Sequence, residues 1–127
     1  MTIRVDIKNF TENELSCRCG CHRLNYDDNF LVLLQAFRLI YGKALIPTSG
    51  CRCAKHNLNV GGVTTSLHQC ETKKASACDV TGDNVKDIFE KAKVFGGFNE
   101  VIYYPKKNFV HLGLDKNQKC NYFAIIN

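Results

Sequence analysis

The sequence has no long hydrophobic run and no recognisable targeting segment. No stretch approaches the ~18 consecutive apolar residues that a membrane helix requires, so we expect no membrane partner. Residues 1–6 lack the apolar core and the small-residue cleavage site of a secretory signal. We therefore expect synthesis in the cytoplasm, with any action outside the cell depending on another route of delivery.

Internal repeats, low-complexity tracts and interdomain linkers are also missing from the sequence. The 127 residues are enough for one domain with a substantial core, and we expect residues 1–127 to form a single domain. The net charge of +5 is modest and spread along the chain. Such charge fits an anionic partner, either a cell-wall polymer or a nucleic acid, or simply a solvated surface. Because no recognition helix or aromatic stacking platform is visible, we expect no nucleic acid partner.

The eight cysteines are many for this length, but they lack the CxxC spacing of zinc ribbons. They form a CRCGC group at residues 17–21, a CRC group at 51–53 and three single positions at Cys70, Cys78 and Cys120. An even number is compatible with disulfides, whereas the missing secretory signal favours free thiols. Three interpretations stay open: small buried hydrophobic residues, disulfides, or a second metal site.

Hydrophobic spacing and capping residues predict the helices. Thr11 and Glu14 have the spacing of a capping box, which predicts a short helical turn. An aspartate pair at residues 27–28 begins a longer helix that ends at Gly42. We expect its buried stripe to leave Gln35 outside and to contain Phe30, Leu33, Leu34, Phe37, Ile40 and Tyr41.

The remaining chain alternates between helix and strand signals. A brief helix is predicted over residues 54–58, and a second amphipathic helix is predicted from an Asp83 cap to the glycines at 96–97. Strand patterns occur at residues 44–50, 77–80, 100–104, 109–114 and 122–126. This order of elements predicts an α+β domain with a small antiparallel sheet and helices packed on one of its faces.

Two histidines and one aspartate are candidate metal ligands. His68 is expected in a loop, Asp79 in an apolar strand, and His111 in a later strand between two apolar residues. Two imidazoles and a carboxylate suit zinc, and three protein ligands leave a fourth position open, as in catalytic zinc sites. Because a single histidine is more often structural than metal-binding, the spacing alone leaves both interpretations of His111 open.

Five short motifs carry a family resemblance. They are SGCRCAKHN at residues 49–57, VGGV at 60–63, SLH at 66–68, ACD at 77–79 and FVH at 109–111. In this order they resemble the signatures of the zinc D-Ala-D-Ala carboxypeptidase family. That family includes many phage-borne peptidoglycan peptidases and shares its fold with the amino-terminal domain of hedgehog proteins. The CRCGC group is similar to a cysteine loop of the phage-type members.

The resemblance implies a function and a set of roles. Zinc would be held by His68, Asp79 and His111, Arg52 would hold a peptide carboxylate or an oxyanion, and Ser66 would hydrogen-bond near the site. The implied reaction is cleavage of an amide bond in the stem peptide of peptidoglycan, as a carboxypeptidase or an endopeptidase. The implied protein is a monomer or a virion component that reaches the wall during lysis, as an endolysin does.

Two departures from the family pattern affect these expectations. Four extra residues, 71–74, separate His68 from Asp79, and we expect them to bulge out without moving either ligand. A disulfide between Cys70 and Cys78 is one way to close that bulge, subject to Cα geometry.

The second departure concerns the catalytic base. Related sequences place a glutamate shortly before the last histidine or an aspartate two residues after it, and here Tyr104 and Gly113 occupy those places. Glu100 and Glu71 are the nearby carboxylates, so Arg52, Glu100 and Tyr104 are the candidate catalytic residues. The missing carboxylates also support an alternative, a catalytically weakened zinc module that binds the cell wall or forms part of a virion.

Overall fold

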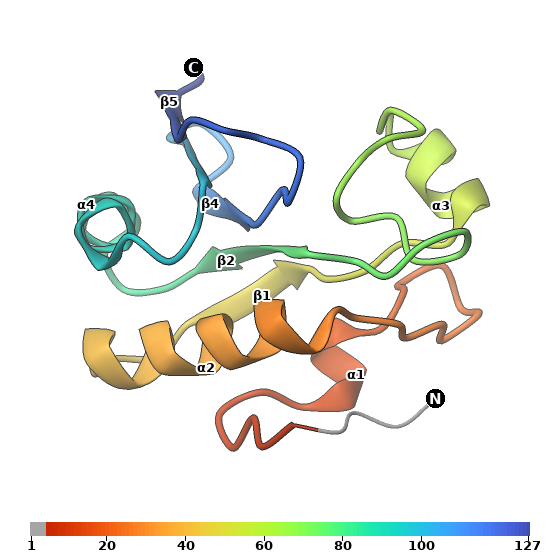
Figure 1. Ribbon diagram of the computed structural model, residues 1–127, viewed down its shortest axis with the longest axis horizontal. Coiled ribbons are helices and arrows are strands. Elements are labelled where there is room, and N and C mark those ends of the chain that lie inside the picture. The colour runs from red at the N-terminus through yellow and green to blue at the C-terminus, as the bar shows by residue number, and fades with distance from the viewer. Residues whose placement is uncertain (1–4) are drawn as a thin grey trace.

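The computed structural model describes residues 5–127 and contains four helices and five strands (Figure 1). Residues 1–4, part of the segment searched for a signal sequence, lie outside the described residues. The elements in chain order are α1 (Glu12–Leu15), α2 (Asp28–Tyr41), β1 (Ile46–Ser49), α3 (Ala54–Asn59), β2 (Ala77–Thr81), α4 (Val85–Phe95), β3 (Glu100–Tyr104), β4 (Phe109–Gly113) and β5 (Tyr122–Ile125).

The five strands form one sheet in the order β1-β2-β4-β3-β5. The expected α+β class is confirmed, but the sheet is mixed because β5 runs parallel to β3 while the other pairs are antiparallel. The registers explain this direction. Gly113, at the end of β4, and Tyr122, at the start of β5, both pair with Glu100. The connection from β4 to β5 therefore passes only the Glu100 end of β3. Because β3 begins at that end, β5, which also begins there, runs parallel to it.

Helices α2 and α4 cover one face of the sheet and enclose the core (Figure 1). Aromatic side chains dominate the interior, where Phe37 packs against Phe98 and Phe95 with ring centroids 5.9 and 5.3 Å apart. Val80 and Val110, which are register partners in β2 and β4, belong to the same core. Because strand side chains alternate between faces, the neighbouring pair Asp79 and His111 lies on the opposite face of the sheet. Within residues 5–127, no helix has the length and apolar character needed to cross a membrane.

The buried stripe of α2 differs from the expected one. Leu31 is only 1% exposed, whereas Ile40 is 71% exposed, so the buried face lies nearer the start of the helix. Gln35 is buried rather than outside the stripe, because its amide hydrogen-bonds the side chain of Asn9 at 2.7 Å. The segment before α1 therefore covers this part of the helix, a contact that periodicity within the helix cannot indicate.

The N-cap of α4 is Asn84 and not the expected Asp83. The Asn84 side chain accepts a hydrogen bond from the backbone N–H of Asp87 at 3.1 Å, which satisfies a donor of the first turn. The helix thus begins one residue later than predicted, since both residues are good caps and only the backbone path distinguishes them. The other expected caps, Thr11, Asp27, Gly42 and Gly96, are confirmed.

This correction predicts different costs for two neighbouring substitutions. Asn84→Ala should lower the free energy of unfolding by about 1 kcal/mol, because the first turn of α4 loses a hydrogen bond to its backbone. Asp83→Ala, the matched control, should change it by less than about 0.5 kcal/mol. Urea denaturation followed by circular dichroism measures both, and a larger cost for Asp83→Ala would contradict this cap assignment.

Candidate metal centre

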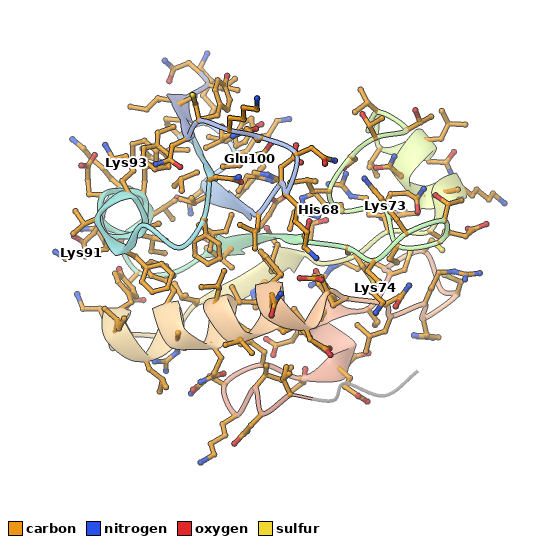
Figure 2. All side chains as sticks on the ribbon, in the orientation of Figure 1. His68, Lys73, Lys74, Lys91, Lys93 and Glu100 are labelled. Atoms are coloured by element: carbon orange, nitrogen blue, oxygen red, sulfur yellow. The ribbon has the colours of Figure 1, made fainter. Side chains whose placement is uncertain are left out.

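His68, Asp79 and His111 converge on one point above the sheet. Asp79 Oδ1 lies 3.1 Å from His68 Nε2 and 3.0 Å from His111 Nδ1, and the two nitrogens are 3.3 Å apart. Asp79 and His111 are register partners in β2 and β4, so the sheet itself places them side by side. His68 reaches them from the loop before β2, near the centre of the molecule in Figure 2.

The outer hydrogen bonds of the two imidazoles determine which ring nitrogen carries the proton and which presents a lone pair to the centre. His68 Nδ1 lies 2.7 Å from the Gly50 carbonyl oxygen, which can only accept, so this nitrogen carries the proton. His111 Nε2 likewise lies 2.9 Å from the Glu100 carboxylate and donates to it. The inward nitrogens of the neutral rings therefore carry lone pairs that face an Asp79 oxygen. Such an arrangement requires a proton or a cation at its centre.

The size of this arrangement fits zinc. Zinc bonds to nitrogen and oxygen of about 2.0–2.1 Å place tetrahedral ligand atoms about 3.3 Å apart. The three separations here are 3.0, 3.1 and 3.3 Å. The side chains of His68 and Asp79 are buried and that of His111 is nearly so, which limits competition from water. A three-ligand set of this kind leaves a fourth position for a substrate or a water molecule.

The ionisation of the site agrees with a requirement for positive charge. Burial would raise the pKa of Asp79, but the charges and hydrogen bonds of His68 and His111 outweigh it and hold this pKa well below its usual range. Burial would lower the pKa of His111, whereas its hydrogen bonds to Asp79 and Glu100 raise that pKa to about 9. In the metal-free protein, a proton on His111 therefore supplies the charge that a metal ion would replace.

Arg52 approaches the same carboxylate from the loop after β1. Its Nη2 lies 3.9 Å from Asp79 Oδ2, while Nε donates to Ser49 Oγ and Nη1 donates to Asn57 Oδ1, both at 3.3 Å. Asn57 is itself held, because its Nδ2 donates to the Val63 carbonyl at 2.7 Å. Two of the three guanidinium nitrogens are thus anchored, and the third faces the outer oxygen of the Asp79 carboxylate.

Two glycines of the sequence motifs are required by close packing at this point. A Cβ at Gly50 would lie 2.2 Å from the Leu15 carbonyl oxygen, and the Gly50 carbonyl is the acceptor for His68. A Cβ at Gly62 would lie 2.2 Å from Asn57 Oδ1, the atom that anchors Arg52. The SGCR and VGGV motifs therefore orient the first histidine and the arginine.

Comparison with known proteins identifies the family. A family model described as Peptidase M15 matches residues 8–113 of the chain, which is most of its length. This chain belongs to the peptidase M15 family. M15 peptidases are zinc-dependent metallopeptidases, so both the resemblance seen in the motifs and zinc as the cofactor are confirmed. A comparison with curated proteins gave no match.

The inserted residues 71–74 form an ordered turn beside the candidate metal centre. Gln69 holds this turn, since its Oε1 accepts from the backbone N–H groups of Glu71 and Thr72 at 2.6 and 2.9 Å. The backbone closes on either side, where Ser76 N donates to the Leu67 carbonyl at 2.8 Å. His68 and Asp79 still meet, so the insertion displaces neither residue, as expected.

The cysteines near this insertion are free thiols, and Cys70 is not bonded to Cys78. The Cys51 thiol donates to the Arg23 carbonyl at 3.1 Å. The side-chain hydrogen bonds of Gln69 close the turn without the disulfide considered from the sequence.

Glu100 occupies the space where Gly113 has no side chain. The two residues are register partners in β3 and β4, and a Cβ at Gly113 would lie 2.9 Å from Glu100 Oε1 and 3.0 Å from His111 Nε2. A carboxylate therefore reaches His111 from the neighbouring strand. It contacts the ring nitrogen that faces away from Asp79, which suits positioning of His111 better than removal of a proton from a substrate water.

The other candidate residues are distributed around a cleft of about 250 Å³. Ser66 and Tyr104 line this cleft, and Ser66 Oγ also accepts from the His68 backbone N–H at 3.2 Å. Glu71 lies elsewhere, where its carboxylate accepts from the Ala54 backbone N–H at 3.0 Å. Two lining residues, Lys107 and Phe109, were missed from the sequence. Because residues two apart in a strand share a face, the position of His111 would have placed Phe109 on the cleft side. Lys107 lies in the turn before this strand, where no such periodicity applies.

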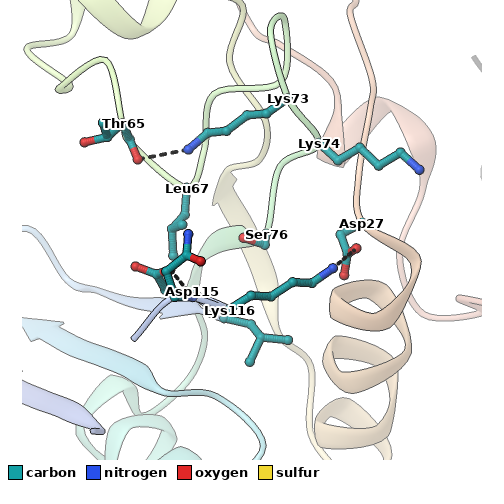
Figure 3. Close-up of a pocket in the computed structure, with 10 residues that line it drawn as sticks. Asp27, Thr65, Leu67, Lys73, Lys74, Ser76, Asp115 and Lys116 are labelled. Carbon is teal, nitrogen blue, oxygen red and sulfur yellow. Dashed lines mark hydrogen bonds and ion pairs between the residues drawn. The ribbon is translucent and has the colours of Figure 1, made fainter. Parts of the chain in front are cut away.

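A larger cavity of about 520 Å³ lies beside this cleft (Figure 3). Leu67 lines the larger cavity while its neighbours Ser66 and His68 line the cleft, so this segment divides the two. Two lysines of the larger cavity are engaged, since Lys116 is paired to Asp27 at 3.0 Å and Lys73 donates to the Thr65 carbonyl at 2.9 Å, while Lys74 also lines it. The convergent atoms of His68, Asp79 and His111 lie in the smaller cleft.

The contact between Glu100 and His111 predicts an effect on metal affinity. Glu100→Ala should weaken zinc binding roughly ten- to hundredfold, because the His111 ring loses the acceptor that fixes its orientation. Glu100→Gln should weaken it less, since the amide oxygen still accepts from Nε2. Competition with a zinc-chelating dye measures the dissociation constants, and an unchanged constant in Glu100→Ala would contradict the positioning role.

Proposed function

We propose that this M15 chain is a zinc peptidase that cleaves an amide bond in the stem peptide of bacterial peptidoglycan, as a carboxypeptidase or an endopeptidase. The observation that carries this proposal is the convergence of His68 Nε2, His111 Nδ1 and Asp79 Oδ1, each presenting a lone pair to one point in an open cleft. The metal ligands in this proposal are those three residues, and the substrate would enter from the side lined by Arg52, Ser66 and Tyr104.

Zinc in such a site polarises the substrate carbonyl and makes water acidic near neutral pH. The remaining work falls to the side chains of the cleft. The third guanidinium nitrogen of Arg52 is placed to donate to a peptide carboxylate or to an oxyanion. Burial and nearby negative charge raise the pKa of Tyr104, so its phenol stays protonated and acts as a donor to the same developing charge. Glu100 keeps the His111 ring in its metal-binding orientation.

Charge on the protein suits a wall polymer that is partly anionic. Lys107 lines the cleft, and its positive charge can attract a carboxylate of the stem peptide. Elsewhere the lysines are dispersed, with Lys91 and Lys93 on α4 and Lys73 and Lys74 on the far side of the molecule (Figure 2). The resemblance of the cysteine loop to phage-type members supports a phage-derived protein that reaches the wall during lysis or on a virion, as a monomer or as part of that particle.

One observation favours a second candidate function. Among residues 5–127, Asp79 is the only carboxylate that lines the cleft, and it is already committed to the two histidines. A peptidase usually has a further base within about 3 Å of its water. A zinc module that binds the wall with little or no turnover is therefore the alternative, and it predicts sedimentation with wall fragments without release of peptides.

Removal of the metal tests the proposed function. Incubation with a chelator, or the substitution His68→Ala, should abolish the release of peptide fragments from purified peptidoglycan, because the ligand set is broken. Zinc should restore the chelated protein but not His68→Ala. His56→Ala, which changes a histidine outside the centre, is the matched control and should retain full activity. Mass spectrometry of the fragments identifies the cleaved bond, and full turnover without metal would contradict the proposal.

The two donors of the cleft predict effects on turnover rather than on folding. Arg52→Lys and Tyr104→Phe should each lower kcat by roughly 10²–10³-fold, because each removes a hydrogen bond to charge that develops in the transition state. Zinc content should stay unchanged. The matched control is Tyr103→Phe, since Tyr103 points to the helix face and packs on Phe89 at 5.6 Å. If both variants kept the wild-type kcat, the proposed roles would be wrong.

A further inference from the structure

A second group of candidate metal ligands lies outside the candidate zinc centre. Cys17, Cys19 and Cys21 come from the loop after α1, and Cys53 immediately precedes α3. Their four sulfur atoms all lie within 4.8 Å of one another. Cys19 Sγ is 3.6 Å from Cys17 Sγ and 3.6 Å from Cys53 Sγ, so it links the loop to the start of α3. None of these residues contributes to the cleft described above.

We propose that Cys17, Cys19, Cys21 and Cys53 bind a second zinc ion as a closed site of four thiolates. Zinc–sulfur bonds of about 2.3 Å place tetrahedral sulfurs about 3.8 Å apart, close to the two separations of 3.6 Å. A disulfide instead joins sulfurs in pairs at about 2.05 Å and would leave the grouping of four unexplained. Zinc is favoured over other metals because four soft thiolates in a tetrahedral arrangement are typical of structural zinc.

The backbone is already arranged to support thiolates. The N–H groups of Cys53 and His56 donate to Cys17 Sγ and Cys53 Sγ, both at 3.4 Å, and Arg23 N–H donates to Cys21 Sγ at 3.5 Å. Hydrogen bonds to sulfur favour the charged form that a metal binds. The loop backbone turns at Gly20 and His22, which adopt positive φ values of 100° and 56°.

The proposed site would brace the segment that carries Arg52. Cys53 follows Arg52 directly, and a metal that joins it to the loop at residues 17–21 would fix one end of this segment. The other end is fixed by the hydrogen bond from Cys51 N to the Leu15 carbonyl at 3.0 Å. A four-thiolate site has no open position, so its role is structural and separate from the chemistry of the cleft.

The metal content of the purified protein tests this inference. Elemental analysis should find two zinc ions per wild-type chain and one in the double variant Cys19→Ser/Cys21→Ser, which removes two exposed ligands. His68→Ala should also contain one. Cys120→Ser, the matched control at another exposed cysteine, should contain two. Retention of one zinc by the double variant, together with an unchanged circular dichroism spectrum, shows that it has folded.

Cobalt substitution gives a direct spectroscopic readout of thiolate ligation. The His68→Ala protein loaded with cobalt should show the intense near-ultraviolet absorption of thiolate-to-cobalt charge transfer. Adding the two cysteine substitutions to His68→Ala should abolish it. The inference is overturned if His68→Ala binds no metal or lacks this absorption, or if the mass of the unreduced wild-type protein shows a disulfide among these four cysteines. Because these measurements do not involve peptidoglycan, they stand or fall independently of the proposed function.

Discussion

The contact among His68 Nε2, His111 Nδ1 and Asp79 Oδ1 would be repulsive if nothing positive lay between them, because each atom presents a lone pair. The surrounding structure maintains this contact. The register of β2 and β4 pairs Asp79 with His111, and the carbonyl of Gly50 and the carboxylate of Glu100 each take the outer proton of one imidazole. The raised pKa of His111 reflects the same need for positive charge, because without a metal ion a proton on this ring supplies it.

The loop motifs also fix the position of Arg52 in the cleft. Gly62 lets Asn57 approach, Asn57 and Ser49 hold two nitrogens of Arg52, and the third nitrogen faces Asp79. Arg52 also bridges to the histidine segment through its backbone, donating to the His68 carbonyl at 2.7 Å. The metal ligands and the substrate-facing donor are therefore parts of one hydrogen-bonded unit, which explains why residues 49–68 contain three of the recognisable motifs.

Local signals in the sequence were sufficient for most elements, whereas the proposed ligand set came from the resemblance carried by the ordered motifs. Caps and glycines located the helix ends, and alternation around His111 indicated a strand that holds it on the face opposite the core. What could not be predicted depends on long-range contacts. Asn9 buries Gln35, the connection across β3 makes β5 parallel, and Glu100 is brought beside Gly113 only by strand pairing. Strand pairing thus places a carboxylate beside the outer nitrogen of His111, which no spacing along the chain reveals.

Crystallographic diffraction data collected on both sides of the zinc absorption edge test the central claim most directly. The account predicts an anomalous peak about 2.0–2.1 Å from His68 Nε2, His111 Nδ1 and an Asp79 carboxylate oxygen. Well-ordered density for the three side chains without such a peak, in crystals grown with zinc, would contradict it.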